Sequence, residues 1–185
     1  QDWARFMGIF IPDHNLQLFE FNRLVRHVGE TEVAEIMSRL SEHFDVMPLP
    51  DDLFQPTGIH EFSMYYREVW YRLRLKKKLS ELDEDALDAN ILTALILKPV
   101  FGISDLRNDD RVGFLSGLKG VAELKRTVDR GDYDFAFGLF PVSMEQFFKF
   151  SDIGLMMPPK TTWFEPKLLN GLVIYDIYNG KPADL

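Results

Sequence analysis

The segment from residue 60 to residue 75 constrains the fold more than any other, because it has the pattern of a β-hairpin. Between residues 69 and 75, Trp70, Arg72 and Arg74 alternate with apolar side chains, which is the period of a strand with one buried face. Residues 60–66 form a second strand-like run, and two polar residues, Arg67 and Glu68, separate the runs. We therefore expect a hairpin with one buried and one cationic face.

Strand and helix patterns alternate along the rest of the chain. Further strand patterns lie at residues 6–11, 16–21, 133–140 and 168–177. Helix patterns lie at residues 33–44, 91–96, 120–128 and 144–151. Thr31 is the N-cap that we expect for the first helix, Pro99 ends the second, and Ser143 with Gln146 has the form of a capping box. The turn composition of residues 12–15 predicts that the two strands around it form another hairpin.

These patterns predict the α+β class, with a mixed β-sheet covered by helices. The acidic segment 80–85 divides one domain into two subregions. The first, residues 1–79, contains the hairpins and the first helix. The second, residues 80–185, ends in a Pro-Pro-Lys-Thr-Thr loop and a final strand. We also expect Pro48, Pro50 and Pro56 to break regular structure.

Composition excludes several classes of function. With 29 acidic and 21 basic residues the formal net charge is −8, which repels a phosphate backbone, so we do not expect nucleic acid as a partner. The chain has no cysteine, which excludes thiolate metal sites and thiol nucleophiles and fits a cytoplasmic protein. Its apolar runs are far shorter than the roughly 20 residues that a membrane-spanning helix needs, so no membrane is expected.

The loop of residues 156–172 is the strongest candidate for a binding site. Three prolines stiffen it, and it carries Lys160, Thr161, Thr162 and Lys167. Two ammonium groups and two hydroxyl groups on a rigid loop suit an oxyanion such as a phosphate. The alternative is a surface corner in which the threonine hydroxyls bond to the local backbone and the lysines are solvated.

Two further residues are candidates for ligand binding. His60 with Glu61 suggests an acid–base pair, although neighbouring strand residues point to opposite faces; the alternative is a structural histidine. Arg23 follows a predicted strand, where it either pairs with a carboxylate of the second subregion or reaches a bound ligand. The remaining histidines lack ligand-like spacing, and residues 105–111 do not have the spacing of a calcium loop, so we expect no metal site. The basic stripe from Arg72 to Lys78 suits contact with nucleic acid or a phosphorylated ligand; the alternative, which we expect, is the solvated face of an edge strand.

Several of these motifs occur together in a known family. Leu87-Asp-Ala-Asn-Ile91, Pro99-Val-Phe-Gly-Ile103 and Met157-Pro-Pro-Lys-Thr-Thr-Trp-Phe-Glu-Pro-Lys167 are similar to the C-terminal part of an uncharacterised family, domain of unknown function 1015. Phe21-Asn-Arg-Leu-Val25 and His60-Glu-Phe-Ser-Met64 also resemble its pattern. Full-length members carry an upstream Asp-Gly-His-His-Arg motif that resembles the phosphate-handling motif of ParB-like proteins and free-serine kinases. That motif is absent from this sequence.

The resemblance implies that the chain is a C-terminal fragment and that the catalytic residues lie upstream of Gln1. It then forms the phosphate- or nucleotide-binding half of a small-molecule kinase-type protein, with ADP or ATP and Mg²⁺ as cofactors of the whole protein. No phosphoryl transfer is expected from the fragment alone. The alternative is a non-catalytic assembly module that packs on the N-terminal half or on a second copy in a homodimer.

Overall fold

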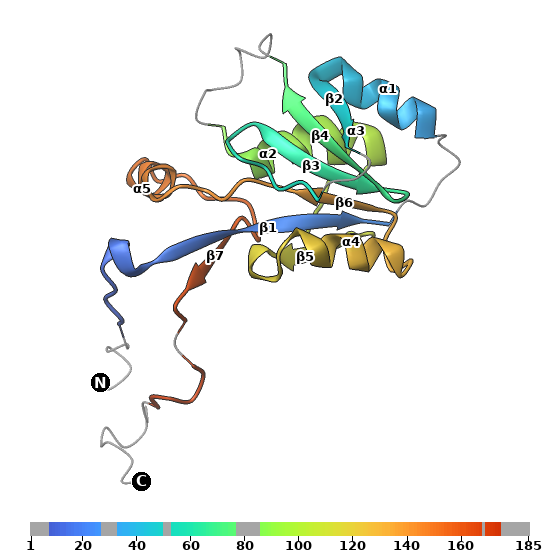
Figure 1. Cartoon of the computed structure of the whole chain (residues 1–185). Helices are drawn as coiled ribbons and strands as arrows, with labels where there is room; N and C mark the ends of the chain where they lie inside the picture. The colour runs from blue at the N-terminus through green and yellow to red at the C-terminus, as the bar shows by residue number, and fades with distance from the viewer. Residues whose placement is uncertain (1–7, 27–32, 50–52, 77–85, 168, 175–185) are drawn as a thin grey trace. The chain divides into compact units, whose positions relative to one another are not determined.

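The computed structural model describes residues 8–26, 33–49, 53–76, 86–167 and 169–174. The chain divides into two compact units, one formed by Leu18–Trp163 and the other by Gln1–Gln17 with Phe164–Leu185. The larger unit contains the sheet and the helices (Figure 1). Within the described parts of the chain, every helix is too short or too polar to cross a lipid bilayer.

The sheet of the larger unit is antiparallel. Its strand order is β2-β4-β3-β6-β1-β5, and β7 pairs with β1 beside this order. The strands are β1 (Gln17–Val25), β2 (Phe44–Leu49), β3 (Glu61–Tyr66), β4 (Val69–Leu75), β5 (Val112–Ser116), β6 (Phe135–Gly138) and β7 (Thr162–Glu165). All five neighbour pairs in this order are antiparallel, so the predicted α+β class is confirmed, with an antiparallel sheet in place of the mixed one that we expected.

The predicted hairpin of residues 60–75 is present as β3 and β4. Arg67 and Glu68 form its turn with φ angles of 44° and 64°, the left-handed values of a two-residue type I′ turn. The predicted central strand is also confirmed, because β6 is buried and lies between β3 and β1. Strands from both predicted subregions therefore share one sheet. The boundary itself, residues 80–85, lies outside the described residues, and the division stays a prediction.

Three of the predicted helices form close to their expected positions. They are α1 (Val33–His43), α4 (Val121–Asp129) and α5 (Met144–Asp152). The capping box of α5 is confirmed, because Ser143 Oγ accepts a hydrogen bond of 3.1 Å from the Gln146 amide while the Gln146 side chain accepts one from the Ser143 amide. Thr31, the expected N-cap of α1, lies outside the described residues.

The second helix extends beyond its prediction. A helical segment runs through α2 (Asp88–Leu92), a π-helical turn (Thr93–Leu97) and α3 (Lys98–Phe101), so Pro99 does not end it as we expected. Pro99 lies in the first turn of α3, directly after the π-helical turn, where the regular i→i−4 hydrogen bonds that a proline would break are already interrupted. The segment ends at Gly102, which has a left-handed φ of 67°.

Three predictions that concern the strands differ from the structure: two predicted strands and one predicted break. Among the described residues before β1, residues 8–12 form no strand, so there is no N-terminal hairpin, and a 3₁₀ turn at Asp13–Asn15 leads into β1. Pro48 lies inside β2 instead of breaking it, because β2 is an edge strand on which a missing N–H is tolerated. Residues 169–174 of the predicted final strand form turns and bends, and the rest of that prediction, Leu168 and residues 175–177, lies outside the described residues.

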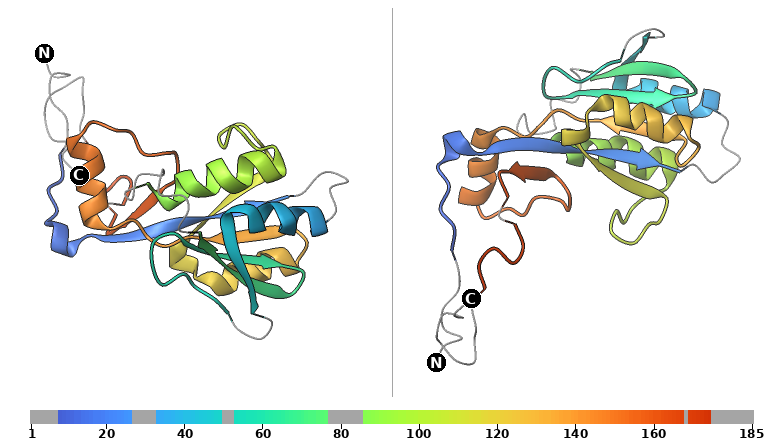
Figure 2. Two further views of the ribbon diagram at one scale, coloured as in Figure 1. Left: turned by 90° about the horizontal axis from the view of Figure 1, so that it is seen from above. Right: turned by 60° about the horizontal axis from the view of Figure 1, so that its bottom comes forward.

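The helices cover both faces of the sheet (Figure 2). On one face, α1, α2 and α3 pack over Phe62, Phe135 and Phe137. On the other face, Leu124 of α4 packs against Tyr65 and Ala136. The central strands are therefore buried on both sides, and any polar side chain on them has lost its contact with water.

Candidate functional site

Polar side chains, most of them buried, lie toward one end of the three central strands, where β3 begins, β6 ends and the middle of β1 passes. The register of the sheet brings these segments together, because Ser63 of β3 lies opposite Gly138 of β6, and Arg23 of β1 lies opposite Phe137. We call this region the polar end of the sheet. Its residues are Glu20, Asn22, Arg23, His60, Ser63, Asp88, Lys160 and Thr161.

Arg23 is the most unusual of these residues, because its side chain is 0% exposed although it carries a positive charge. The guanidinium Nη1 donates a hydrogen bond of 2.6 Å to the carbonyl of Phe21, and the guanidinium carbon lies 4.8 Å from the ring centre of Phe114. Its Nε and Nη2 have no hydrogen-bond partner among the described residues. Burial lowers the pKa of Arg23 to about 10. Within the part of the chain that the structure describes, Arg23 is thus a buried cation without an anionic partner.

Glu20 and Asn22 lie on the opposite face of β1. The Asn22 side-chain nitrogen donates a hydrogen bond of 3.3 Å to Glu20, and its oxygen accepts one of 3.0 Å from the amide of Leu139. Both side chains are buried. Asn22 therefore joins β1 to the end of β6 and fixes the position of the Glu20 carboxylate.

Asp88 joins the beginning of β3 to the end of β6. Its Oδ1 accepts a hydrogen bond of 2.8 Å from the amide of His60, and the amide of Phe140 also donates to this carboxyl group. Burial raises the pKa of Asp88 to about 7, against the effect of these two amides. Asp88 Oδ2 and His60 Nε2 are buried and have no partner in the described parts of the chain.

Glu61 and His60, which the sequence suggested as an acid–base pair, have other hydrogen-bond partners in the structure. Glu61 is bound by the amide and hydroxyl of Thr57, at 2.9 and 3.0 Å, and by Arg74 at 3.1 Å. Burial alone would raise the pKa of Glu61, but these hydrogen bonds outweigh it and lower the pKa. His60 contacts Asp88 through its backbone and has a left-handed φ of 63°. Non-glycine residues in this conformation are often found at functional sites.

The basic stripe of β4 is not on an edge strand, because β2 covers that side of β4. Arg74 donates to Glu61, and Arg72 lies 3.9 Å from the same carboxylate. Lys77 and Lys78 lie outside the described residues. The two arginines of the stripe thus take part in an ion-pair cluster with Glu61.

The turn before β7 places Lys160 beside β1. Lys160 is exposed and has a left-handed φ of 56°, and its Nζ lies 5.2 Å from the ring centre of Phe21. The ring of Trp163 contacts Phe21 edge-on, with 5.7 Å between the ring centres. Among the described residues, no carboxylate lies within 4.0 Å of the Lys160 ammonium group. Phe21 thus contacts both cations: its carbonyl accepts a hydrogen bond from Arg23, and its ring lies next to the ammonium group of Lys160.

The threonines of this loop differ in their contacts. Thr161 is buried, and its hydroxyl donates a hydrogen bond of 2.7 Å to the carbonyl of Pro158. This is the bond to the local backbone that the alternative reading, a surface corner, predicted. Because the hydroxyl hydrogen is used in this bond, Thr161 can only accept a hydrogen bond from a ligand. Thr162 is half-buried at the start of β7. Lys167 belongs to the smaller unit, so its predicted cooperation with Lys160 stays a prediction.

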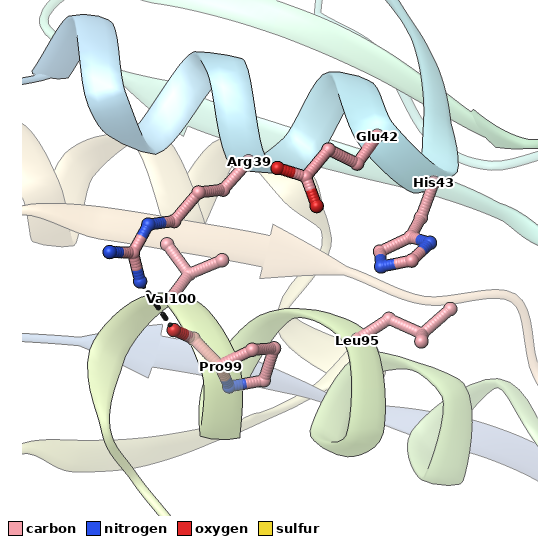
Figure 3. Close-up of a pocket in the computed structure, with 6 residues that line it drawn as sticks. All are labelled: Arg39, Glu42, His43, Leu95, Pro99 and Val100. Atoms are coloured by element: carbon pink, nitrogen blue, oxygen red, sulfur yellow. Dashed lines mark hydrogen bonds between the residues drawn. The ribbon is translucent and has the colours of Figure 1, made fainter.

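A separate pocket of about 240 Å³ lies between α1 and the segment 95–100 (Figure 3). Arg39, Glu42 and His43 line it from α1, and Arg39 donates a hydrogen bond of 2.8 Å across it to the carbonyl of Pro99. The close-up shows His43 and Leu95 on opposite sides of the opening. The pocket contains none of the residues that the sequence predicted for a site.

The sequence pointed to six residues: Arg23, His60, Lys160, Thr161, Thr162 and Lys167. The first four belong to the polar end, whereas Thr162 and Lys167 do not, and the predicted role of all six in binding stays a prediction. Glu20, Asn22, Ser63 and Asp88 were missed. A polar residue in an alternating strand pattern predicts a solvent-facing side chain, and only the central position of β1 reverses this for Glu20 and Asn22. Asp88 lies three residues before the predicted helix of residues 91–96, and a carboxylate near a helix N-terminus normally indicates only a favourable dipole interaction.

Two solved structures are similar to this chain. A structure described as "Free serine kinase in complex with AMP" matches with a TM-score of 0.50 and 14% identity, over 82% of this chain and 55% of that one. A conserved hypothetical protein from Pyrococcus furiosus matches with a TM-score of 0.49 and 13% identity, over 82% of this chain and 57% of that one. The chain thus spans little more than half the length of these structures.

Sequence comparisons give a family but no characterised relative. No curated protein matches the chain. The model of the family described as "Protein of unknown function (DUF1015)" matches residues 1–95, which is more than half of the 185 residues. This stretch contains β1, α1 and the β3–β4 hairpin, and with them Glu20, Asn22, Arg23, His60 and Asp88 of the polar end. The chain belongs to the DUF1015 family.

Proposed function

We propose that the polar end of the sheet binds the phosphate group of a nucleotide or of another phosphorylated small molecule. The observation that carries this proposal is the Arg23 guanidinium, which is fully buried and has two unpartnered nitrogens among the described residues. A buried cation without an anion costs several kcal/mol, so an anion that reached it would be bound strongly. Arginine suits a phosphate in particular, because its planar group donates two parallel hydrogen bonds.

Lys160 supports the same ligand. Its ammonium group lies over the ring of Phe21, whose carbonyl accepts the hydrogen bond from Arg23. An exposed cation next to a buried one gives an anion a first point of contact at the surface. The side chains that cover Arg23 must then move, and changes of side-chain rotamer between the free and the bound state are common at binding surfaces.

On this proposal the chain is the ligand-binding half of a small-molecule kinase-type protein of the cytoplasm. The similarity to a free serine kinase solved with AMP favours a nucleotide, and the 55% coverage of that chain leaves room for a second half that carries the catalytic groups. ADP or ATP with Mg²⁺ are the cofactors that we expect for the whole protein. His60 and Lys167 are further candidates for ligand contacts.

The test is calorimetric titration of AMP into the intact protein and its Lys160→Ala variant. Loss of one charge-assisted hydrogen bond should weaken binding about ten- to hundredfold, with unfolding stability nearly unchanged. Lys98→Ala is the matched control, because Lys98 is an exposed lysine of α3 that does not belong to the polar end of the sheet. Unaltered AMP affinity in a folded Lys160→Ala variant would refute the proposal. A large loss of stability would instead assign Lys160 to a structural corner.

A second candidate function is favoured by the surface around α5. This nine-residue helix has no buried residue, and four large apolar side chains on or just after it are exposed: Phe148, Ile153, Leu155 and Met156. Apolar patches of this kind mark contacts with other proteins. In this alternative the chain is an assembly module that packs on the N-terminal half or on a second copy. Self-association in sedimentation experiments that is lost in a Leu155→Glu variant would support it, whereas a strictly monomeric chain at high concentration would exclude the second copy.

A further inference from the structure

The pocket between α1 and the segment 95–100 has the features of a second binding site. Its lining residues are Arg39, Glu42 and His43 of α1 on one wall, and Leu95, Pro99 and Val100 on the other (Figure 3). The volume of about 240 Å³ is slightly below the roughly 300–1,000 Å³ of sites for drug-sized ligands, so the pocket suits a small molecule. It shares no residue with the polar end of the sheet.

The wall formed by residues 95–100 is an irregular part of its helical segment. Leu95 lies in the π-helical turn Thr93–Leu97, and Pro99 follows this turn in α3. Single π-helical turns within helices are frequently found at functional sites. Leu95 is half-buried and Val100 is buried, so this wall is an apolar surface.

The charge of Arg39 is already compensated within the protein. Its guanidinium group donates a hydrogen bond of 2.5 Å to Glu35, one turn earlier on α1, and one of 2.8 Å to the carbonyl of Pro99. Arg39 therefore holds α1 against α3, and its ion pair with Glu35 leaves little positive charge in the pocket to attract an anion.

The Glu42 carboxylate has no such compensation. Among the residues that the structure describes, no lysine, arginine or histidine nitrogen lies within 4.0 Å of it, and it accepts no hydrogen bond. Glu42 lies in the last turn of α1, where the helix dipole disfavours a negative charge and favours a positive one. Lys76 donates to the carbonyl of Ser41 in this turn but makes no ion pair with Glu42. The position thus favours a cation from outside the chain.

His43 adds a second acceptor beside this carboxylate. Its side chain is half-buried, and within the described ranges its ring makes no hydrogen bond. A neutral imidazole has one nitrogen that accepts a hydrogen bond. Figure 3 shows the Glu42 carboxylate between the side chains of Arg39 and His43. Two neighbouring residues of α1 therefore offer carboxylate and imidazole acceptors to a ligand that faces the apolar wall.

These groups favour a guanidinium group over an ammonium ion or a metal ion. A planar guanidinium group matches a carboxylate with two parallel hydrogen bonds and has further N–H donors for the imidazole. It is also more weakly hydrated than an ammonium group, so it loses less on contact with Leu95 and Val100. The described residues contain no group of three or more histidine, cysteine or acidic side chains that would hold a metal.

We propose that this pocket binds a small molecule that carries a guanidinium group. Glu42 accepts two hydrogen bonds from this group, His43 accepts a third, and the hydrocarbon part of the ligand lies on Leu95 and Val100. The ligand then joins α1 to the helical segment 95–100, as Arg39 does, and stabilises the folded chain. This site is separate from the phosphate site and does not depend on the function proposed above.

The test is calorimetric titration of the whole chain with n-butylguanidine, n-butylurea and n-butylamine. The urea has the same planar shape without the charge, and the amine has the same hydrocarbon chain with a different cation. n-Butylguanidine should bind saturably and raise the melting temperature, and the other two should bind about tenfold more weakly or less. Glu42→Gln should weaken n-butylguanidine binding about tenfold, and His43→Ala about two- to tenfold. Glu145→Gln, at an exposed position of α5, is the matched control.

Several results would overturn the inference. These are the absence of saturable binding, equal affinity for the urea or the amine, and unchanged affinity in folded Glu42→Gln or His43→Ala. Tighter binding of N-acetylarginine amide than of n-butylguanidine would assign the pocket to an arginine of another protein, and so overturn the choice of a small molecule. Titration with AMP separates this inference from the proposed function, because AMP affinity should be the same in wild type and Glu42→Gln.

Discussion

Replacing Asp88 by Asn should change how the stability of the protein depends on pH. Burial raises the pKa of Asp88 from 3.8 to about 7 in the folded chain. Between these two values the folded state binds more protons than the unfolded state, so the contribution of Asp88 to stability is present at low pH and is lost as the pH rises toward 7. Each pH unit in this window corresponds to about 1.4 kcal/mol. From pH 5.5 to pH 8 the loss is therefore about 2 kcal/mol.

The Asp88→Asn variant lacks this loss, because an amide side chain does not ionise in this pH range. The amide oxygen can still accept a hydrogen bond from the backbone N–H of His60, which keeps the link between β3 and the helical segment. Urea unfolding at several pH values between 5.5 and 8 measures the effect, with Asp152→Asn, at an exposed position at the end of α5, as the control. The free energy of unfolding of Asp88→Asn should rise relative to wild type by about 2 kcal/mol across this range. Parallel curves for wild type and variant would refute the reasoning.

Three further predictions follow from the packing and from the family. Gly117→Ala should destabilise the protein by about 1–3 kcal/mol in urea unfolding, because its Cβ would overlap the Glu20 carboxylate, whereas Gly58→Ala, which has nothing within 4 Å of the added carbon, should not. Tyr65→Phe should cost about 1 kcal/mol in thermal unfolding, since it removes the 2.7 Å hydrogen bond from the buried Tyr65 hydroxyl to Asp129; equal melting temperatures would contradict this. The purified chain should transfer no phosphoryl group from ATP or ADP, and turnover that survives removal of contaminants would disprove this expectation.

Local patterns predicted most of the secondary structure because they report local physics. The alternation in residues 69–75 and the two-residue turn at Arg67 and Glu68 produced the β3–β4 hairpin. The capping box at Ser143 marked the first residue of α5. In each case the signal lies within a few residues of the structure that it predicts.

Predictions failed where a distant part of the chain decides the outcome. Pro48 was read as a strand breaker, but it is tolerated because β2 has a neighbour on one side only. Residues 6–11 have the composition of a strand, yet composition does not supply a pairing partner, and residues 8–11 remain unpaired. The antiparallel arrangement of the whole sheet is a property of the topology, which no single segment encodes.

The sequence by itself determined the fold class, the hairpin and the main helices, and it named six candidate residues: Arg23, His60, Lys160, Thr161, Thr162 and Lys167. Only the tertiary structure decided that four of them, Arg23, His60, Lys160 and Thr161, lie toward one end of the sheet, together with Glu20, Asn22, Ser63 and Asp88. The reason is burial: β1 lies in the centre of a sheet that helices cover on both faces. A polar side chain that a strand pattern assigns to water is, in that position, buried in the protein interior, where it needs a partner in place of the water that it has lost.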